Sequence, residues 1–311
     1  MLKLFLLLFL PLYGGDVRDY LQPAPRSSAS SQMRNIDFIY LINLDERPEK
    51  LALSLQKLAP YHITPCRFPA INGWNLPLDA LNHLGVQCES WMSNGHFATY
   101  YGGAEGKTPL HELFGIPGRT YFCHCMPLGA IGCVLSHLSV LQAAFDAGYQ
   151  TIWVIEDDIE VVQNPHLLSD LIDELDEAVG LDGWDVLFTD PDTKNTDGIH
   201  VPCTSYAWRP NYTPPNPHHF AEKKEVGAHF RQIGARYGSY SMILRRSGIK
   251  KILNFIKCYQ LFLPYDMEYT QPANIRLFAL KEDLVSTLPR APSDNGAPNY
   301  ILNPKGWQTD D

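Results

Sequence analysis

Three consecutive carboxylates, Glu156, Asp157 and Asp158, follow an unbroken apolar stretch and are the residues of this sequence best placed to do chemistry. Neighbouring acids repel one another, so gathering them at one point is costly unless a cation binds there. Hard oxygen ligands suit Mg²⁺ or Mn²⁺, which commonly bridge one or two carboxylates to the phosphates of a substrate. The pattern predicts a divalent cation at Glu156 and Asp158; alternatively, the acids simply end a strand in water.

Residues 151–155 (TIWVI) must position these acids. A run of strand-forming residues without polar alternation is typical of a strand that is buried on both faces. In an open α/β sheet the ligand lies beyond the carboxyl ends of the strands. We therefore expect the three acids to face a ligand.

The chain opens with a pattern of strand, turn, helix and strand. We expect a strand over residues 37–44, a helix from Pro48 to about residue 58, and a second strand over residues 66–71. The first turn of such a unit commonly receives a nucleotide, so Asn43, Asp45 and Arg47 are candidate nucleotide contacts. The alternative for Arg47 is a solvent-facing residue at the start of the helix. The sequence contains no GxGxxG and no Walker motif, which counts against a dinucleotide oxidoreductase and a P-loop NTPase.

Further strands and helices alternate along the chain. The periodicity predicts a helix over residues 129–145, which carries Ser136 and His137, and another helix that begins at residues 164–165. A strand over residues 184–188 should follow by a right-handed parallel crossover from the strand that precedes the acids. We also expect a strand at 240–244, a helix capped by Ser247, and short strands at 275–280 and 284–288. Residues 74–126 and 193–237 are predicted to be two long irregular insertions.

Composition sets the broad class of the protein. The 311 residues include 45% hydrophobic and 19% charged residues, which is typical of a globular protein. The net charge of −9 argues against a nucleic-acid partner. Seven cysteines suggest no even disulfide framework, and the spacing of Cys123 and Cys125 around His124 is tighter than that of structural zinc sites. We expect these cysteines to fill the core.

The N-terminus has a composition of its own. Residues 4–10 (LFLLLFL) follow Lys3 and end at Pro11, so we expect residues 1–15 to be an export signal or a short membrane-interface anchor. Residues 16–33 are rich in proline and serine and are predicted to be a linker. One domain is expected over residues 34–311. The protein would then be exported or associated with a membrane through its N-terminus, and the cytoplasmic face of a membrane remains an option.

Several separated motifs resemble glycosyltransferase family 25, which contains lipopolysaccharide galactosyl- and glucosyltransferases and collagen galactosyltransferases. The matching motifs are residues 42–48 (INLDERP), 70–73 (AING), 129–137 (GAIGCVLSH), 155–158 (IEDD), 184–187 (WDVL), 240–252, 264–266 (PYD) and 293–294 (SD). They occur in family order over residues 36 to 295, which is far more specific than any single motif. Two departures concern the acceptor side: Ala130 stands where the family usually has an acid, and the two insertions have no counterpart.

The resemblance implies a GT-A fold, that is, a Rossmann-like, mainly parallel mixed sheet flanked by helices. It also implies a UDP-sugar donor, Mn²⁺ or Mg²⁺ as cofactor, and inversion at the anomeric carbon. Asp158 would be the direct metal ligand together with Glu156, and Asp266 matches a late family aspartate that would act as general base. Glu268, Asp190 and Asp294 stay open as alternatives for the base. The other residues that match motifs near the donor are Asn72, Gly73, Ser136, His137 and Asp157.

The expected function is therefore the transfer of galactose or glucose from a UDP-sugar to a hydroxyl group of a lipid-linked, glycan or protein acceptor, such as lipopolysaccharide. Two alternatives stay open. The same three acids could activate water in a metal-dependent hydrolase of a phosphorylated substrate. The chain could also be a catalytically silent relative that binds glycans.

Overall fold

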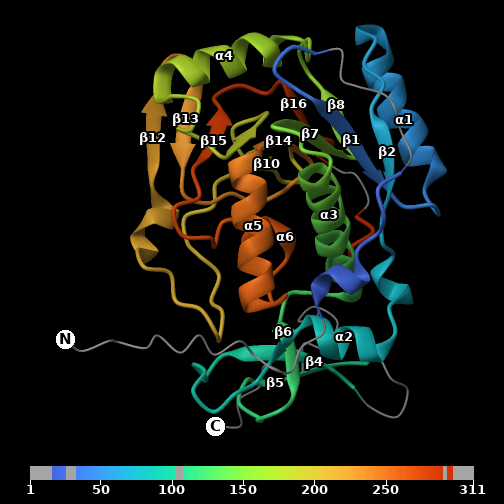
Figure 1. Ribbon diagram of the computed structural model, residues 1–311, viewed down its shortest axis with the longest axis vertical. Helices are drawn as coiled ribbons and strands as arrows, with labels where there is room; N and C mark the ends of the chain where they lie inside the picture. Colours follow the sequence, from blue (N-terminus) through green and yellow to red (C-terminus); the bar gives the residue numbers. More distant parts are fainter. Residues whose placement is uncertain (1–15, 26–32, 103–107, 290–292, 297–311) are drawn as a thin grey trace.

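The computed structural model describes residues 16–25, 33–102, 108–289 and 293–296 (Figure 1). The expected signal or anchor at residues 1–15 lies outside this part of the chain, as do residues 26–32 of the expected linker. Residues 16–25 form part of the folded domain. They contain a short 3-10 helix, η1 (Val17–Tyr20), and the hydroxyl of Tyr20 lies 2.6 Å from Nδ1 of His83, while the backbone N–H of Gln22 donates to Oγ of Ser139.

A mixed eight-stranded sheet forms the centre of the molecule, with the strand order β12-β13-β15-β9-β14-β7-β1-β2. Its strands are β1 (Phe38–Asn43), β2 (Cys66–Pro69), β7 (Thr151–Glu156), β9 (Val186–Phe188), β12 (Lys223–Val226), β13 (Phe230–Ile233), β14 (Ser241–Arg245) and β15 (Leu277–Leu280). The pairs β1–β2, β1–β7 and β9–β15 are parallel, and the other neighbours are antiparallel. The expected mixed α/β fold is confirmed, with a larger antiparallel share than predicted.

Both faces of the sheet are buried, which explains the apolar runs in the sequence. In β7, Ile152 and Val154 pack into one core cluster, while Trp153 and Ile155 pack into the cluster on the opposite face. Helices α3 (Leu128–Asp146) and α5 (Arg246–Tyr259) cover the first face. Helices α1 (Pro48–Leu58) and α4 (Leu167–Val179) contribute to the second cluster. The remaining helices are α2 (Leu78–Leu84), α6 (Tyr265–Glu268), and the 3-10 helices η2 (Ala59–Tyr61), η3 (Gly73–Asn75) and η4 (Pro217–Ala221).

Helix α3 is the central helix of the fold (Figure 1). Within the described residues it alone is long and apolar enough to cross a membrane, by length and composition. However, 83% of that apolar stretch is buried among other elements, as befits the core helix of a globular domain. It ends before Gly148, whose φ of 80° suits glycine at a helix stop.

The first insertion is more regular than the sequence suggested. It contains α2 and a separate four-stranded antiparallel sheet in the order β3-β6-β4-β5, which lies below the main sheet in Figure 1. Its strands are β3 (Val86–Gln87), β4 (Phe97–Gly102), β5 (Thr108–Leu113) and β6 (Thr120–Cys123). Apolar residues of β4 and β6 join the core cluster that α3 and α5 share. Tertiary packing therefore stabilises strands that are too short and mixed in composition to be recognised locally.

The second insertion is also partly ordered, and it extends the main sheet. Its hairpin β12–β13 pairs with β15 and turns at Gly227, where φ is 62°. Two short strands, β10 (Thr193–Lys194) and β11 (His200–Val201), form a separate ladder, and β8 (Ile159–Val161) pairs with β16 (Val285–Thr287). The predicted crossover from β7 to β9 needs one correction, because β14 lies between these strands and is antiparallel to both.

Candidate active site

A cleft opens at the carboxyl ends of β1 and β7, where the sequence predicted a ligand. The parallel register places Ile42 beside Glu156, so the first turn and the acids meet at one edge of the sheet. The cleft measures about 640 Å³, including the solvent at its mouth. Its polar lining comprises Asn43, Lys50, Asn72, Cys133, Ser136, His137, Glu156, Asp157, Asp158, Ser293, Asp294 and Asn295.

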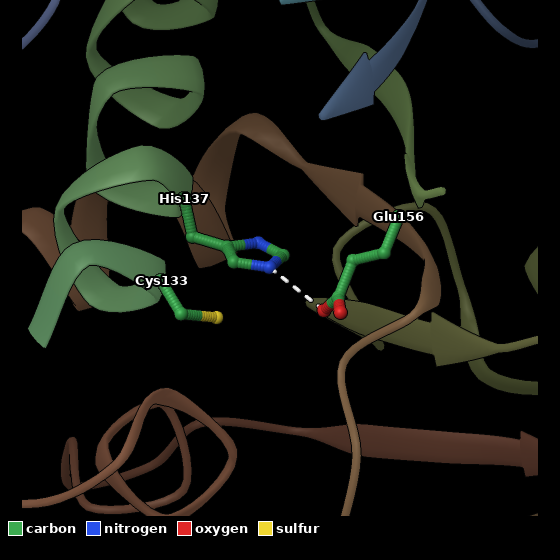
Figure 2. Close-up of side chains that lie close together, drawn as sticks. All are labelled: Cys133, His137 and Glu156. Carbon is green, nitrogen blue, oxygen red and sulfur yellow. Dashed lines mark hydrogen bonds and ion pairs between the residues drawn. The ribbon is translucent and has the colours of Figure 1, made fainter. Parts of the chain in front are cut away.

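Glu156, at the end of β7, is held from two sides. One of its oxygens, Oε1, lies 2.9 Å from Nε2 of His137 (Figure 2). The same oxygen accepts a hydrogen bond of 2.6 Å from the hydroxyl of Ser239. Burial raises the pKa of Glu156, but the hydrogen bonds from His137 and Ser239 outweigh it and hold the pKa below its usual range. Glu156 is therefore a fixed carboxylate that stays ionised.

His137 is a buried residue of α3, and its ring stacks on Tyr265 with 4.1 Å between the centroids and 15° between the planes. Tyr265 is itself buried at the start of α6. The histidine thus links the acids at the end of β7 to helix α6. Its packed position explains how a helical histidine, which sequence reasoning could equally read as a core residue, comes to point at a carboxylate.

Asp157 faces the first turn of the chain. Nδ2 of Asn43 donates to its Oδ2 over 2.7 Å and to the carbonyl of Arg47 over 2.9 Å. The hydroxyl of Ser54 in α1 donates to the backbone carbonyl of Asp157. Asn43 therefore ties the predicted nucleotide turn to the acids, although the two lie more than a hundred residues apart in the sequence.

Asp158 is the acid that is most open to a cation. Its Oδ1 is buried and has no hydrogen-bond partner among the described residues. Burial and the charges of Glu156 and Asp157 raise the pKa of Asp158 to about 7. A buried carboxylate oxygen without a partner is unfavourable, and a bound divalent cation would remove this penalty. The residues present therefore fit Mn²⁺ or Mg²⁺, with Asp158 as ligand and Glu156 beside it.

Two cations of α1 and its entry turn lie near the acids. Nζ of Lys50 and the guanidinium of Arg47 each contact the carboxylate of Asp294 at 2.5 Å. Burial raises the pKa of Asp294, but its bonds to Arg47 and Lys50 outweigh burial and lower the pKa. Arg47 is thus exposed at the start of α1, as the alternative predicted, and its guanidinium binds Asp294 and is not directed at the three acids. The ion pair with Asp294 closes one side of the cleft.

Asn72, Gly73 and Ser136 build the wall of the cleft. Oδ1 of Asn72 accepts from the backbone of Trp74 and caps η3, and the hydroxyl of Ser136 accepts from the backbone N–H of Ile71 over 2.8 Å. A Cβ atom on Gly73 would lie 1.7 Å from the carbonyl oxygen of Leu128. Only glycine therefore allows η3 to approach α3 this closely.

Asp45 stands apart from the other residues predicted for the nucleotide. Its side chain is exposed and forms an ion pair with Arg67, outside the lining of the cleft. Strand periodicity could not reveal this, because a turn residue can point in any direction once the backbone leaves the sheet.

Asp266 faces a second hollow of about 460 Å³, lined in part by Tyr206, Tyr237 and Thr270. Its Oδ2 accepts a hydrogen bond of 3.0 Å from the backbone of Gly238, the neighbour of the Ser239 that holds Glu156. Burial raises the pKa of Asp266 above its ordinary value, despite the bond from Gly238. A carboxylate with a raised pKa is a better proton acceptor near neutral pH.

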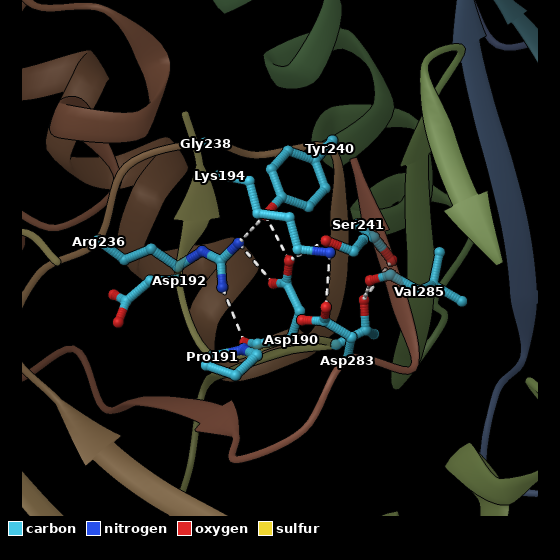
Figure 3. A network of polar contacts seen from close by, with 12 residues as sticks. Asp190, Pro191, Asp192, Lys194, Arg236, Gly238, Tyr240, Ser241, Asp283 and Val285 are labelled. Atoms are coloured by element: carbon cyan, nitrogen blue, oxygen red, sulfur yellow. Dashed lines mark hydrogen bonds and ion pairs between the residues drawn. The ribbon is translucent and has the colours of Figure 1, made fainter. Parts of the chain in front are cut away.

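Asp190 and Glu268, two of the three alternatives for the base, are structural residues in this fold. Asp190 is fully buried, pairs with Arg236 at 2.6 Å and accepts from the hydroxyls of Tyr240 and Ser286 (Figure 3). Glu268 forms an ion pair with the fully buried Arg209. Its Oε1 also accepts from the backbone N–H groups of residues 262 and 263. Because these oxygens are already engaged away from the cleft, neither residue is kept as a candidate base.

Comparisons with known proteins identify the family of the chain. A sequence profile described as "Glycosyltransferase family 25 (LPS biosynthesis protein)" matches residues 36–268, about three quarters of the chain. The chain belongs to glycosyltransferase family 25. The family resemblance of the sequence motifs is thereby confirmed, and the protein is assigned to the glycosyltransferases.

Individual relatives in family 25 are distant. A "Glycosyltransferase 25 family member" of Aedes aegypti is 25% identical over 173 residues, which are 56% of this chain and 23% of the relative. One of Drosophila melanogaster is 24% identical over 206 residues, or 63% of this chain and 28% of the relative. The human "Inactive glycosyltransferase 25 family member 3" is 25% identical over 181 residues, or 55% and 26%. The chain spans about a quarter of the length of these relatives.

The family 25 cleft contains residues that the sequence did not single out. Lys50, Ser239 and Tyr265 position Asp294, Glu156 and His137 respectively. Cys133, to which the sequence gave no role of its own, lines the cleft one helical turn before His137. The sequence offered one signal for Cys133, its place inside the GAIGCVLSH motif. Ser239 carried no signal, because its role depends on the approach of a distant loop.

Proposed function

We propose that the protein transfers a hexose, galactose or glucose, from a UDP-sugar to an acceptor hydroxyl group with inversion at the anomeric carbon. Family 25 membership gives the reaction class. The observation that carries the donor assignment is the buried Oδ1 of Asp158, which has no hydrogen-bond partner among the described residues and lies in a cleft that also contains Glu156, Asp157 and Lys50. This arrangement suits a diphosphate that is bound through a divalent cation.

On the donor side, Asp158 and Glu156 would hold Mn²⁺ or Mg²⁺, which when bound supplies positive charge for the departing nucleotide diphosphate. Asn43 and Asp157 would contact the nucleotide, and Asn72 and Gly73 would shape the wall against which it lies. His137 and Ser239 keep the carboxylate of Glu156 in one orientation, so little reorganisation is needed when the donor arrives. Lys50 and Arg47 would meet the phosphates by leaving their ion pair with Asp294.

On the acceptor side, Asp266 is the proposed general base. In a single inverting displacement the acceptor oxygen attacks the anomeric carbon as its proton passes to the base. Burial prepares Asp266 for this role by raising its pKa, and the bond from Gly238 fixes its position. The acceptor would therefore approach through the hollow that contains Tyr206 and Tyr237. Aromatic side chains in such a hollow would suit the apolar faces of a sugar.

The acceptor class is a lipid-linked, glycan or protein hydroxyl. The family profile is described by lipopolysaccharide biosynthesis, which favours a glycan or lipid-linked acceptor. The apolar segment at residues 4–10 supports export or peripheral contact with a membrane, including its cytoplasmic face.

The test begins with the donor. Thermal unfolding of the full chain is followed with a panel of UDP-sugars, each with and without Mn²⁺, because selective binding to the native state raises the apparent stability. We expect a UDP-hexose to stabilise the protein only in the presence of the metal. Asp158→Asn should abolish this shift, whereas the matched control Asp79→Asn, at an exposed aspartate of α2, should keep it. A metal-dependent shift that survives in Asp158→Asn would remove the metal assignment.

The second stage measures UDP release with candidate acceptors. A transferase releases UDP in proportion to added acceptor. Release that does not depend on any acceptor would indicate a metal-dependent hydrolase instead. Glycan binding without UDP release would indicate a silent relative, an outcome to be tested because the human and mouse relatives carry the word "inactive" in their names.

A further inference from the structure

Cys133, His137 and Glu156 bring three different ligand types together in the lining of the cleft (Figure 2). Cys133 and His137 lie four residues apart on α3 and therefore share one face of the helix. Glu156 reaches them from the end of β7. Each residue offers one ligand atom: the sulfur of Cys133, a ring nitrogen of His137 and a carboxylate oxygen of Glu156. These three atoms lie within 4.8 Å of one another.

The combination of a thiol, an imidazole and a carboxylate is typical of Zn²⁺ sites and differs from the all-oxygen sets that hold Mg²⁺ or Mn²⁺. Three protein ligands leave a fourth tetrahedral position for water. We propose that Cys133, His137 and Glu156 form a Zn²⁺ site, separate in its chemistry from the Asp158 site. The Zn–S bond forms as the S–H bond of Cys133 breaks, and the thiol proton passes to solvent.

The fold can close this site without moving its backbone. Zn–S and Zn–N bonds of about 2.3 and 2.0 Å place tetrahedral ligand atoms roughly 3.5 Å apart. Nε2 of His137 and Oε1 of Glu156, now 2.9 Å apart, would separate slightly to admit the ion, and the sulfur of Cys133, which lies within 4.8 Å of both, would move inward by at most about 1.3 Å. Ser239 can stay bonded to the carboxylate and orient it, as outer-shell groups do at metal sites.

The surroundings of His137 indicate a reversible site and not a structural one. At present its Nε2 contacts Glu156, and that hydrogen bond would be exchanged for a bond to the metal. Its other ring nitrogen, Nδ1, has no hydrogen-bond partner within the described part of the chain. Tightly bound zinc usually has a histidine whose second nitrogen donates to a carboxylate or carbonyl group. We therefore expect Zn²⁺ to be exchangeable.

Zinc at this site has a consequence for catalysis, which rests on the proposed function. Zn²⁺ would compete with Mn²⁺ or Mg²⁺ for the carboxylate of Glu156 and would place a second positive charge beside their site. Binding of Zn²⁺ should therefore inhibit the metal-dependent binding of the UDP-sugar, and excess Mn²⁺ should reverse this inhibition.

The experiment uses the untagged full chain and Co²⁺ as a spectroscopic probe for the zinc site. A thiolate bound to Co²⁺ gives a charge-transfer absorption in the near ultraviolet, which carboxylate ligands do not give. We expect the wild-type protein with Co²⁺ to show this absorption and to lose it when Zn²⁺ is added. Cys133→Ser should lack the absorption, and calorimetry should show that this variant binds Zn²⁺ at least about tenfold more weakly than the wild type. The control Cys258→Ser removes an exposed cysteine and should change neither readout.

Two results would overturn the proposal. One is an unchanged absorption in Cys133→Ser, and the other is an absorption that depends on Cys123 and Cys125, whose sulfurs lie 3.1 Å apart. If Cys133→Ser does not fold, alkylation of the wild-type protein decides instead: Zn²⁺ must protect Cys133 and leave Cys258 reactive. Because all these readouts report binding, they are independent of whether the protein transfers a sugar.

Discussion

Glu268 and Asp266 lie two residues apart in α6, yet the structure gives them opposite roles, and a pair of amide substitutions can test this. In Glu268→Gln the side chain keeps its size and loses its charge. The guanidinium of Arg209 would then be a buried cation without a counterion, since both side chains have no exposed surface. Arg209 would retain its hydrogen bonds to the carbonyl groups of residues 259 and 260 and to Oδ1 of Asn211.

The cost follows from burial. Removing one partner of a buried ion pair destabilises a protein by about 3–5 kcal/mol, because the other charge is left uncompensated. The amide oxygen of glutamine can still accept from the backbone of residues 262 and 263, so no further penalty is added. A loss of this size is a large part of the free energy of unfolding of a typical domain, which is about 5–15 kcal/mol. It should lower Tm by at least about 6 °C.

The assay is urea unfolding followed by tryptophan fluorescence, with the slope of the transition checked for constancy. The matched control is Glu282→Gln, at an exposed glutamate, which should change the free energy of unfolding by less than about 0.5 kcal/mol. Turnover of folded Glu268→Gln, measured well below its Tm, should equal that of the wild type. A variant of normal stability that loses turnover would refute the structural assignment and restore Glu268 as a candidate base.

Three further predictions concern other parts of the site and fold. Asp266→Asn should lower kcat by about 10²–10⁴-fold in acceptor-dependent UDP release, with donor binding and stability retained; a pure loss of donor binding would contradict its role as base. Asp185 is fully buried, and burial alone would raise its pKa. Its hydrogen bonds to Arg276 and Lys251 outweigh burial and lower the pKa below its ordinary value. A carboxylate whose pKa is lower in the folded state stabilises the protein at pH values above its unfolded pKa of about 3.9. Asp185→Asn should therefore lower the free energy of unfolding by about 2–4 kcal/mol at pH 6, and this difference from the wild type should shrink as the pH falls below about 4. A difference that is independent of pH would contradict the pairing. Gly73→Ala places a methyl group against the carbonyl of Leu128. The substitution should therefore lower the free energy of unfolding, measured in urea, by about 1–3 kcal/mol and weaken donor binding. If the free energy of unfolding and the donor affinity stay unchanged, η3 can shift freely.

Much of the framework could be predicted from local patterns. The strand that carries the acids, the opening strand and helix, and the long helix with His137 lie where periodicity placed them, within a few residues. Such patterns are reliable because burial on a sheet face or helix stripe imposes a period on the sequence. The regular structure of the first insertion was not predicted, since its short strands depend on packing against α2 and the core.

The candidate site shows the same division. The sequence by itself determined that Glu156, Asp157 and Asp158 stand at the carboxyl end of a buried strand, because a strand must deliver the residues that follow it to the edge of the sheet. It could not decide which carboxylates are available for chemistry. Asp190 and Glu268 look like Asp158 and Asp266 in the sequence, and only the tertiary structure separates them.

The physical reason is that the role of a carboxylate depends on its partners, and these come from distant parts of the chain. Arg236 and Arg209 neutralise two of the acids in the interior, whereas an oxygen of Asp158 meets no donor among the described residues. Local sequence fixes where an acid enters the fold, and long-range packing decides whether its charge is already compensated.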